Sequence, residues 1–424
     1  MASTEDATAA KSASVWEKMA GVGAPAGPRR KAKALLPDPD PRDRHRPIIS
    51  VDDHIVEPPD IFEGRLPDHL VDRAPRVIED EHGNQFWEVG ARTQATIGLA
   101  AVVGKPVEDW TVDAVRFDEI RKGCWEINSR VHDMDLNGIW ASVCFPSALP
   151  GFAGRNFSKL PDKELGLALV RAWNQWHIEE WAGPYPDRIV PIQLPWLDDP
   201  VVGAEEIRRN AAAGFKAVSF SENPVGHRYP SLHSGHWDPF FQACEETGTV
   251  VCLHAGSSTW SPVLAADAPR AEHTTLFAVN SIVAAADWLW SGIPLRYPDL
   301  KIVLAEGGAS WVPMMVERLD YVLDHSMKGD TGFWDSAELS PSEVFLRSFF
   351  FCMLDDPAGV ALRHTIGVDH LMVESDYPHS DSTWPDTQPT VQRMLGTLPP
   401  DEADRIAYGN AAALFRHPLP PADF

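Results

Sequence analysis

The feature that most constrains the fold is an alternation of short apolar runs with longer amphipathic segments, which begins at Pro47. Runs that are apolar throughout are typical of strands buried on both faces of a parallel sheet. Eight runs rich in Val, Ile and Phe occur, at residues 47–54, 140–146, 188–195, 216–220, 249–256, 301–308, 343–353 and 370–378. Helical patterns lie between several of them, at residues 161–183, 199–214 and 239–248.

Eight strand–helix units predict an α/β fold of the (β/α)8 barrel type, for which about 250 residues are typical. The chain has 424 residues, so it is longer than a minimal barrel. We assign residues 47–424 to the barrel domain, with an insertion around residues 73–123, and residues 1–46 to an N-terminal arm that is flexible or packs on a partner subunit. The alternative fold is an open doubly wound sheet, but no GxGxxG motif follows the first run.

Composition excludes several classes of function. The net charge of -24 argues against binding to nucleic acid or to an anionic membrane surface. No apolar stretch is long enough to span a membrane, and the first residues lack the apolar segment of a secretory signal. The five cysteines are scattered and form no CxxC motif. We therefore expect a cytoplasmic protein with free, buried thiols.

Metal-binding residue types stand at the ends of four of the apolar runs. Asp52 and His54 end the first, His254 ends the fifth, Glu306 ends the sixth and Asp376 ends the last. The active site of a (β/α)8 barrel is built at the carboxyl ends of its strands. Carboxylates and neutral imidazoles are the ligands that hold Zn, Fe or Mn. A single Asp or His at a strand end is more often a cap, but four such ends together predict a metal site.

The first run shows how the ligands would be arranged. Side chains alternate along a strand, so Asp52 and His54 share one face and Asp53 points away. Ionisable groups at the end of a buried strand are costly unless something compensates them. We expect a bound metal ion to provide this compensation.

The chain from about Pro47 to Arg416 resembles the amidohydrolase-related family, which includes metal-dependent decarboxylases of aminocarboxymuconate semialdehyde and of hydroxybenzoates. The resemblance rests on "SVDDHIVEP", "LHAG", "VLAEGGASWVP", "ESDYPHSDSTWP" and "GNAAALF". It implies that Asp52 and His54 are the first-strand metal pair and that His254 is the fifth-strand ligand. It also implies that Asp376 is both a ligand and a base.

Glu306 departs from the family pattern, because the decarboxylases carry a proton-transferring His before Gly-Gly. A carboxyl group replaces that His only if its pKa is strongly raised. Three carboxylates and two imidazoles are better matched to two metal ions than to one. His379 is then a candidate ligand of the second ion, or else contacts the substrate, and His273 is a weaker candidate. We expect Glu57 to cap the turn or to support the ligands.

The resemblance of chains with this Glu to dinuclear oxygenases leads us to expect an Fe or Mn/Fe centre. Such a centre would activate dioxygen to hydroxylate a small organic substrate, with Glu306 and Asp376 as catalytic groups. The first alternative is a hydrolase or decarboxylase, with Zn as the alternative metal and Asp376 as base. The second is a metal-stabilised, non-catalytic subunit of a heteromeric enzyme. No arginine cluster marks a phosphate or dicarboxylate substrate. We expect a homo-oligomer, or a hetero-oligomer with a homologous subunit.

Overall fold

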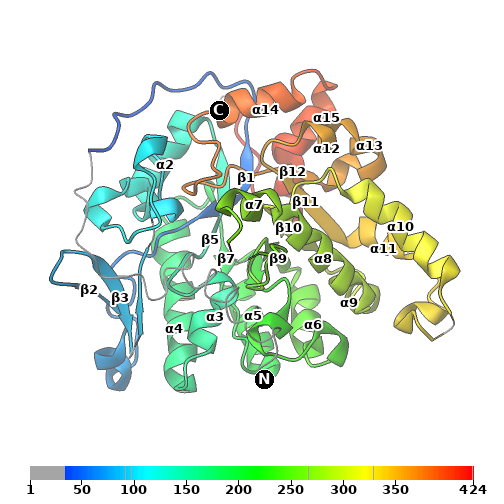
Figure 1. The fold of residues 1–424 in the computed structure, drawn as a ribbon, viewed down its shortest axis with the longest axis horizontal. Coiled ribbons are helices and arrows are strands. Elements are labelled where there is room, and N and C mark those ends of the chain that lie inside the picture. Colours follow the sequence, from blue (N-terminus) through cyan, green and yellow to red (C-terminus); the bar gives the residue numbers. More distant parts are fainter. Residues whose placement is uncertain (1–33, 91, 97, 266, 328, 423) are drawn as a thin grey trace.

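The computed structural model describes residues 34–424, apart from residues 91, 97, 266, 328 and 423. Its centre is a sheet of parallel strands in the order β6-β5-β1-β12-β11-β10-β9-β8-β7, surrounded by helices (Figure 1). The strands are β1 (Ile49–His54), β5 (Ala141–Phe145), β6 (Ile189–Val190), β7 (Ile192–Gln193), β8 (Ala217–Phe220), β9 (Val250–His254), β10 (Ile302–Ala305), β11 (Phe349–Met353) and β12 (Leu371–Val373).

The sheet closes on itself at Pro191. β6 pairs with β5, and β7 pairs with β8, so both edges of the sheet meet in the segment 189–193. Proline has no amide hydrogen and interrupts the ladder there, while the Pro191 carbonyl accepts a hydrogen bond of 2.9 Å from the Lys216 amide. The strands therefore occupy eight positions around a barrel. The (β/α)8 prediction is confirmed, and the open doubly wound sheet is excluded.

Helices follow most strands and cover the outside of the barrel (Figure 1). The α-helices are α2 (Ile127–Asn137), α3 (Arg155–Ser158), α4 (Lys163–Trp176), α5 (Pro200–Ala212), α6 (Asp238–Thr247), α7 (Arg270–Thr275), α8 (Phe277–Trp290), α9 (Ile293–Arg296), α10 (Val312–His325), α11 (Pro341–Ser348), α12 (Pro357–Ala361), α13 (Arg363–Ile366), α14 (Thr387–Leu395), α15 (Pro400–Asp404) and α16 (Asn410–Phe415). The three predicted helices correspond to α4, α5 and α6. Asp162 and Asp199 cap the first two by accepting backbone N–H bonds.

One predicted strand is wrong in part. The apolar run at residues 343–353 is a strand only from Phe349, because α11 occupies its first half. Ser340 and Glu343 form a capping box at the start of that helix. This local signal satisfies the first helical amides, and it fixes a helix even though the following residues are apolar.

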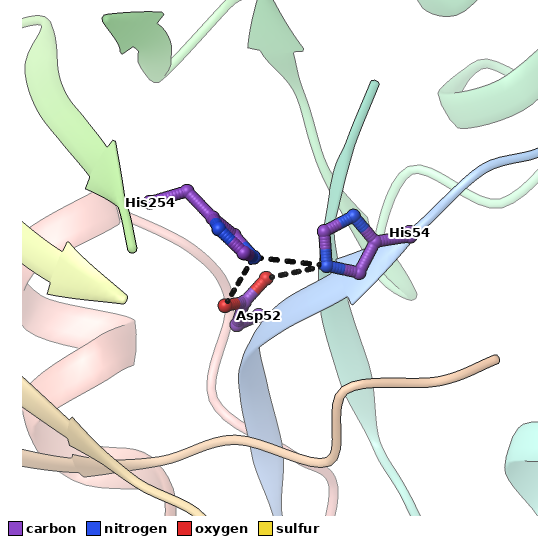
Figure 2. Close-up of side chains that lie close together, drawn as sticks. All are labelled: Asp52, His54 and His254. Atoms are coloured by element: carbon purple, nitrogen blue, oxygen red, sulfur yellow. Dashed lines mark hydrogen bonds and ion pairs between the residues drawn. The ribbon is translucent and has the colours of Figure 1, made fainter. Parts of the chain in front are cut away.

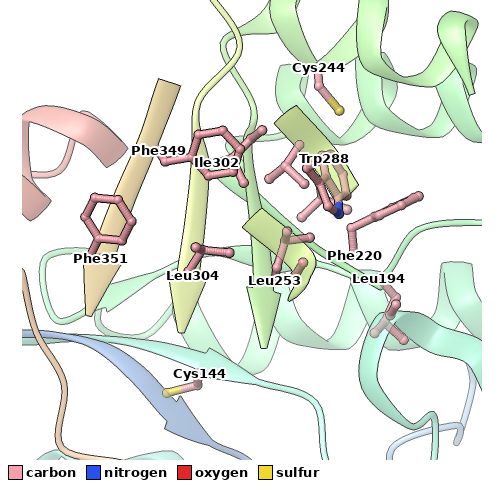
Figure 3. Packing of buried hydrophobic residues seen from close by; sticks show 14 of the residues in the cluster. Cys144, Leu194, Phe220, Cys244, Leu253, Trp288, Ile302, Leu304, Phe349 and Phe351 are labelled. Atoms are coloured by element: carbon pink, nitrogen blue, oxygen red, sulfur yellow. The ribbon is translucent and has the colours of Figure 1, made fainter. Parts of the chain in front are cut away.

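The core has two parts, inside and outside the barrel. Along β10, Ile302 and Leu304 point outward to the helices, whereas Val303 and Ala305 point into the barrel. Figure 3 shows the outer part, where Leu253 and Leu304 lie on the strands and Trp288 of α8 lies near Phe220. Alternation along each strand therefore fills both layers with mainly apolar side chains, and the charged side chains of β1 and β9 stand at the carboxyl ends of these strands.

Two further segments lie outside the barrel. The insertion around residues 73–123 contains an antiparallel sheet of β2 (Arg76–Glu79), β3 (Gln85–Val89) and β4 (Arg92–Gln94), which the sequence did not predict. Residues 34–46 run in extended form and are tied to the barrel by an ion pair of 3.0 Å between Arg46 and Asp404. Residues 1–33 of the predicted arm lie outside the described residues. No helix among the described residues has the length and apolar character needed to cross a membrane.

Candidate metal centre

Five of the predicted ligands meet at the carboxyl end of the barrel. His54 Nε2 lies 3.3 Å from Asp52 Oδ1, 3.1 Å from His254 Nε2 and 3.2 Å from Asp376 Oδ1. His254 Nε2 lies 3.3 Å from Asp52 Oδ2 and 3.5 Å from Glu306 Oε2. Figure 2 shows Asp52 and His54 on β1 facing His254 at the end of β9. The strand ends thus converge on one point.

His379 lies at the edge of this group. Its Nδ1 is 3.1 Å from Asp376 Oδ1, and its ring stacks on that of His54 with centroids 3.7 Å apart. His273 behaves differently: it lies in α7 with its ring edge-on to Phe277, and it is not among the side chains that could share an ion. The structure therefore brings together every predicted ligand except the weaker candidate His273.

The shape of β1 places Asp53 behind the site. The pairing of β1 with β5 shifts register between Ser50 and Asp53, which is a bulge in β1. The Asp53 carboxylate accepts hydrogen bonds from Ser375 Oγ at 2.6 Å and from the Tyr377 amide at 3.0 Å. It also accepts one from Ser142 Oγ. Asp53 therefore joins β1 to the segment that carries Asp376.

Glu306 and Asp376 stand in a backbone conformation that side chains rarely adopt. Their φ angles are +59° and +52°, in the left-handed region. The Asp376 amide donates a hydrogen bond of 2.8 Å to the Asp52 carbonyl, and the Glu306 amide donates one of 3.0 Å to Glu374 Oε2. These bonds hold the chain where it turns away from β10 and β12, so both carboxylates face the centre.

The pKa values of the acids shift in opposite directions, because Asp52 and Glu306 lie among other acids whereas Asp376 contacts two histidines. Burial, with the charges of neighbouring acids, raises the pKa of Asp52 and of Glu306 well above their usual values. Burial also acts on Asp376, but His379 and His54 outweigh it and lower its pKa. Asp376 therefore favours the ionised form.

The imidazoles are suited to binding a metal through Nε2. Burial lowers the pKa of His54 well below its usual value and that of His254 to about 4, so both are neutral at pH 7. His254 Nδ1 lies 2.8 Å from the Ala255 carbonyl, which fixes the proton on Nδ1 and leaves the Nε2 lone pair facing the centre. That tautomer is the one found in metal-ligating histidines.

The unsatisfied groups of the site fit a divalent cation. Among the described residues, both carboxylate oxygens of Asp52 and of Asp376 are buried without a hydrogen-bond partner. His54 Nε2 faces two carboxylates and another imidazole nitrogen, and a single proton cannot satisfy all three. Two ligand atoms that each lie ~2.1 Å from one ion stand about 3.0–3.4 Å apart. The contacts of 3.1–3.3 Å between the side chains match this spacing.

Two overlapping sets of side chains meet the requirement for an ion: Asp52, His54 and His254, and His54, Asp376 and His379. Because the sets share His54, they describe adjacent positions in one site. The prediction of two ions stays a prediction.

Two buried acids and a buried arginine lie around the site, and the two acids were not singled out from the sequence. Glu374 holds the Glu306 amide, and burial raises its pKa to about 8. Glu222, after β8, accepts hydrogen bonds from Ser258, and burial raises its pKa to about 7. Arg130 of α2 donates to the His54 carbonyl and, at 2.7 Å, to that of Gly123. Glu374 could have been predicted as a site residue, because it lies two residues before Asp376 in the same apolar run.

Glu57 supports the site from outside. Its carboxylate accepts hydrogen bonds from the Ser147 amide at 3.0 Å and from Trp173 Nε1 at 3.4 Å. It therefore fixes the loop after β5 to β1, in the supporting role that the sequence suggests for it.

A cavity of about 210 Å³ is lined in part by the candidate metal ligands. Glu306, Asp376 and His379 form one part of its wall. Phe152 and Phe277 form apolar parts, and Phe152 also stacks on His254 at 4.2 Å between centroids. Two arginines, Arg155 and Arg270, line it as well. Arg155 and Arg270 are distant in the sequence, so they form no cluster that the sequence alone would reveal.

Comparison with known proteins identifies the family of the chain. The amidohydrolase family profile matches residues 152–417. A 2-amino-3-carboxymuconate-6-semialdehyde decarboxylase from Dictyostelium discoideum is 24% identical over 215 residues, which cover 50% of this chain and 55% of the relative. The chain thus aligns with about half the length of this curated relative.

Solved structures share the fold. An amidohydrolase from Mycobacterium avium subsp. paratuberculosis superposes with a TM-score of 0.67 at 22% identity, over 87% of this chain and 98% of the other. A dihydroxybenzoic acid decarboxylase from Polaromonas sp. JS666, solved with manganese and 2-nitroresorcinol, gives 0.57 at 17% identity, over 87% and 96%. A 5-carboxyvanillate decarboxylase from Sphingomonas paucimobilis gives 0.54 at 22% identity, over 70% and 84%.

Proposed function

The chain belongs to the amidohydrolase family, and on that basis we propose that it is a metal-dependent carboxy-lyase. Its substrate would be a small aromatic or unsaturated carboxylic acid. The observation that carries the proposal is the buried group of Asp52, His54, His254 and Asp376, whose carboxylate oxygens have no hydrogen-bond partner among the described residues. The names of similar proteins, which are decarboxylases of such acids, support this choice of reaction.

A divalent ion held by Asp52, His54, His254 and Asp376 would supply a Lewis acid for the substrate carboxylate. His54 and His254 stay neutral, and so they offer lone pairs without adding positive charge. Phe152 covers His254 and limits the access of water from that side. The cavity of about 210 Å³ has room for a small planar acid, and Phe152 and Phe277 give its wall apolar surface.

The reaction also needs a proton for the carbon that loses CO2. The carbon–carbon bond breaks, its electron pair stays on that carbon, and a proton takes the place of CO2. His379 lines the cavity and contacts Asp376 at 3.1 Å, so this pair can hold a proton beside the substrate. Glu306 occupies the position of the proton-transferring His of the resembling decarboxylases and is the alternative donor. No oxidant is consumed.

The test is release of labelled CO2 in the absence of oxygen. The manganese-loaded full chain is incubated with a panel of hydroxybenzoates and unsaturated diacids carrying ¹³C in the carboxyl group. We expect ¹³CO2 and a product with hydrogen in place of the carboxylate. The variant Asp52→Asn should lose this activity, and Arg208→Gln, at an exposed ion pair with Glu246, should keep it. Turnover that requires oxygen, or no turnover of any acid, would contradict the proposal.

A second candidate is the dinuclear oxygenase, and Glu306 is the observation that favours it. With Asp52 and Asp376 it places three carboxylates within one buried site, which suits Fe and Mn. Oxygen consumption coupled to a hydroxylated product, absent in Glu306→Ala, would favour this reading. The same measurement separates the two candidates, because a carboxy-lyase consumes no oxygen.

A further inference from the structure

We infer that Arg155 is a carboxylate-binding subsite, so that the substrate carries a second acid group besides the one at the metal centre. This inference rests on the proposed function, which it makes more specific: the substrate is a small aromatic or unsaturated dicarboxylate. The subsite is distinct from the metal ligands, because Arg155 stands after β5, at the start of α3.

The backbone makes room for the Arg155 side chain. Gly151 has a φ of +67°, and a Cβ at this position would lie only 2.9 Å from Arg155 Nε. Any larger residue at position 151 would therefore displace the guanidinium. The loop after β5 thus seats Arg155 against its own backbone, in the wall of the cavity and partly buried.

Within the part of the chain that the structure describes, the Arg155 guanidinium has no hydrogen-bond or ion-pair partner. Among the described residues, no acid forms an ion pair or hydrogen bond with the Arg155 side chain. The other buried arginines do have acceptors: Arg121 binds Asp133 at 2.6 Å, and Arg130 binds the Gly123 carbonyl. The chain has 61 acidic against 37 basic residues, so acidic partners are abundant. A partly buried guanidinium without one is costly unless a ligand supplies the anion.

The neighbours of Arg155 add positive charge. Lys159 stands one helical turn further on, and burial together with Arg155, Arg228 and Arg92 lowers its pKa to about 8. The cavity is therefore polarised. Its wall carries Glu306, Asp376 and His379 as well as Arg155, and Phe152 and Phe277 supply apolar parts of the same wall.

This arrangement selects a ligand with two anionic ends and a flat apolar middle. One carboxylate would face the metal centre and the other the guanidinium, whose planar fork binds a carboxylate through two hydrogen bonds. The cavity of about 210 Å³ limits the middle to a single ring or a short unsaturated chain. Arg270 also lines the cavity and is exposed, so it adds positive charge on the solvent side.

The experiment compares ligands that differ only in the second acid group. Benzene-1,3- and benzene-1,4-dicarboxylate and their mono-amides are titrated by calorimetry into the manganese-loaded full chain. Because the ligands are not required to react, the readout does not depend on turnover. We expect at least one dicarboxylate to bind about ten- to a hundredfold more tightly than its mono-amide. This preference should disappear in Arg155→Gln, while the affinity for the mono-amide stays the same.

Three variants complete the test. Arg155→Lys keeps the charge but loses the fork, and it should retain only part of the preference. Gly151→Ala displaces the guanidinium and should reduce the preference without removing any charge. Arg208→Gln is the control and should leave all affinities unchanged. Thermal unfolding of each variant checks that it is folded.

Two results would overturn the inference: no preference for either dicarboxylate in the native chain, or a preference that survives in Arg155→Gln. A different result would show that the proposed function is wrong while the subsite is correct. If no acid loses CO2 but the preference depends on Arg155, the subsite stands and the carboxy-lyase assignment falls.

Discussion

At the residue scale, adjacent acids in β1 have opposite roles. Asp52 faces the other candidate metal ligands, and neither of its oxygens has a hydrogen-bond partner among the described residues, whereas Asp53 accepts hydrogen bonds from Ser375, Ser142 and the Tyr377 amide. The period-two rule predicts this division from "VDDH" alone. It does not predict that Asp53 would find its donors on β5 and after β12, because those neighbours are set by the closed barrel.

Asp53 should therefore stabilise the fold and position the ligands. We expect Asp53→Ala to lower the free energy of unfolding by about 3 kcal/mol or more, because several buried donors lose their acceptor. Asp53→Asn keeps an oxygen for Ser375 and Tyr377, and the Ser142 hydroxyl can turn to accept from the new amide, so the cost should be about 1 kcal/mol. Urea unfolding of both variants measures the difference, and equal losses would contradict this role.

Glu57 should make stability depend on pH. Burial raises its pKa to about 7 in the folded chain, whereas the unfolded chain releases the proton near 4.5. Between these values the folded state binds more protons, so Glu57 lowers stability as the pH rises through this window. We expect the stability of Glu57→Gln relative to the native chain to increase by about 3 kcal/mol from pH 4.5 to pH 7.5. A pH-independent difference in urea unfolding would be inconsistent with a raised pKa.

At the element scale, the site depends on how the strands end. Glu306 and Asp376 follow β10 and β12 with φ angles of +59° and +52°. Non-glycine residues in this conformation are strained, and such strain is found at functional positions. The sequence places both acids after apolar runs. It carries no sign of the left-handed conformation at Glu306, because Glu rarely adopts it, whereas Asp376 is of a type that adopts it more often.

Replacing Glu306 should separate its backbone strain from its side-chain chemistry. Glu306→Gly and Glu306→Ala both remove the carboxylate, but only glycine adopts a φ of +59° without strain. We expect the glycine variant to be more stable than the alanine variant by about 1 kcal/mol. Thermal unfolding of the metal-free variants measures this difference, and an alanine variant of equal or greater stability would show that the position is unstrained.

Other elements show where local sequence patterns are enough to predict a helix or a strand. Two of the three predicted helices, α4 and α5, begin after an aspartate, and in the structure Asp162 and Asp199 cap them. The first half of the run 343–353 is helical, and its capping box of Ser340 and Glu343 was visible in the sequence. The antiparallel sheet of the insertion was missed, because its strands are short and only partly buried.

At the scale of the whole molecule, closure of the barrel assembles the site. β1, β9, β10 and β12 are far apart in the sequence, yet their ends meet within hydrogen-bond distances. The period of the apolar runs predicts this convergence, and so the side chains that meet at the strand ends could be named in advance. Arg155 and Glu222 could not, because Arg155 begins the short helix α3 and Glu222 follows β8, and packing determines where each side chain lies. The expected oligomer stays a prediction.

If the site holds an ion, the whole chain should gain stability from it. A ligand that binds only the folded state at about 100 times its Kd adds ~2.7 kcal/mol to the free energy of unfolding. We expect manganese to raise the Tm of the chelator-treated native chain. Asp52→Asn should show no such increase. An equal rise in both proteins would place the ion elsewhere.

The most direct test of the central claim is a calorimetric titration of manganese into the chelator-treated full chain. We predict that the native chain binds the ion and that His254→Ala weakens binding by more than about a hundredfold. Loss of a group that only hydrogen-bonds to a metal ligand lowers metal affinity about 10–100-fold, and loss of a ligand itself should cost more. His69→Ala removes an exposed histidine and should bind as the native chain does. Absence of binding to the native chain, or unchanged binding to His254→Ala, would contradict the metal centre and with it the proposed reaction.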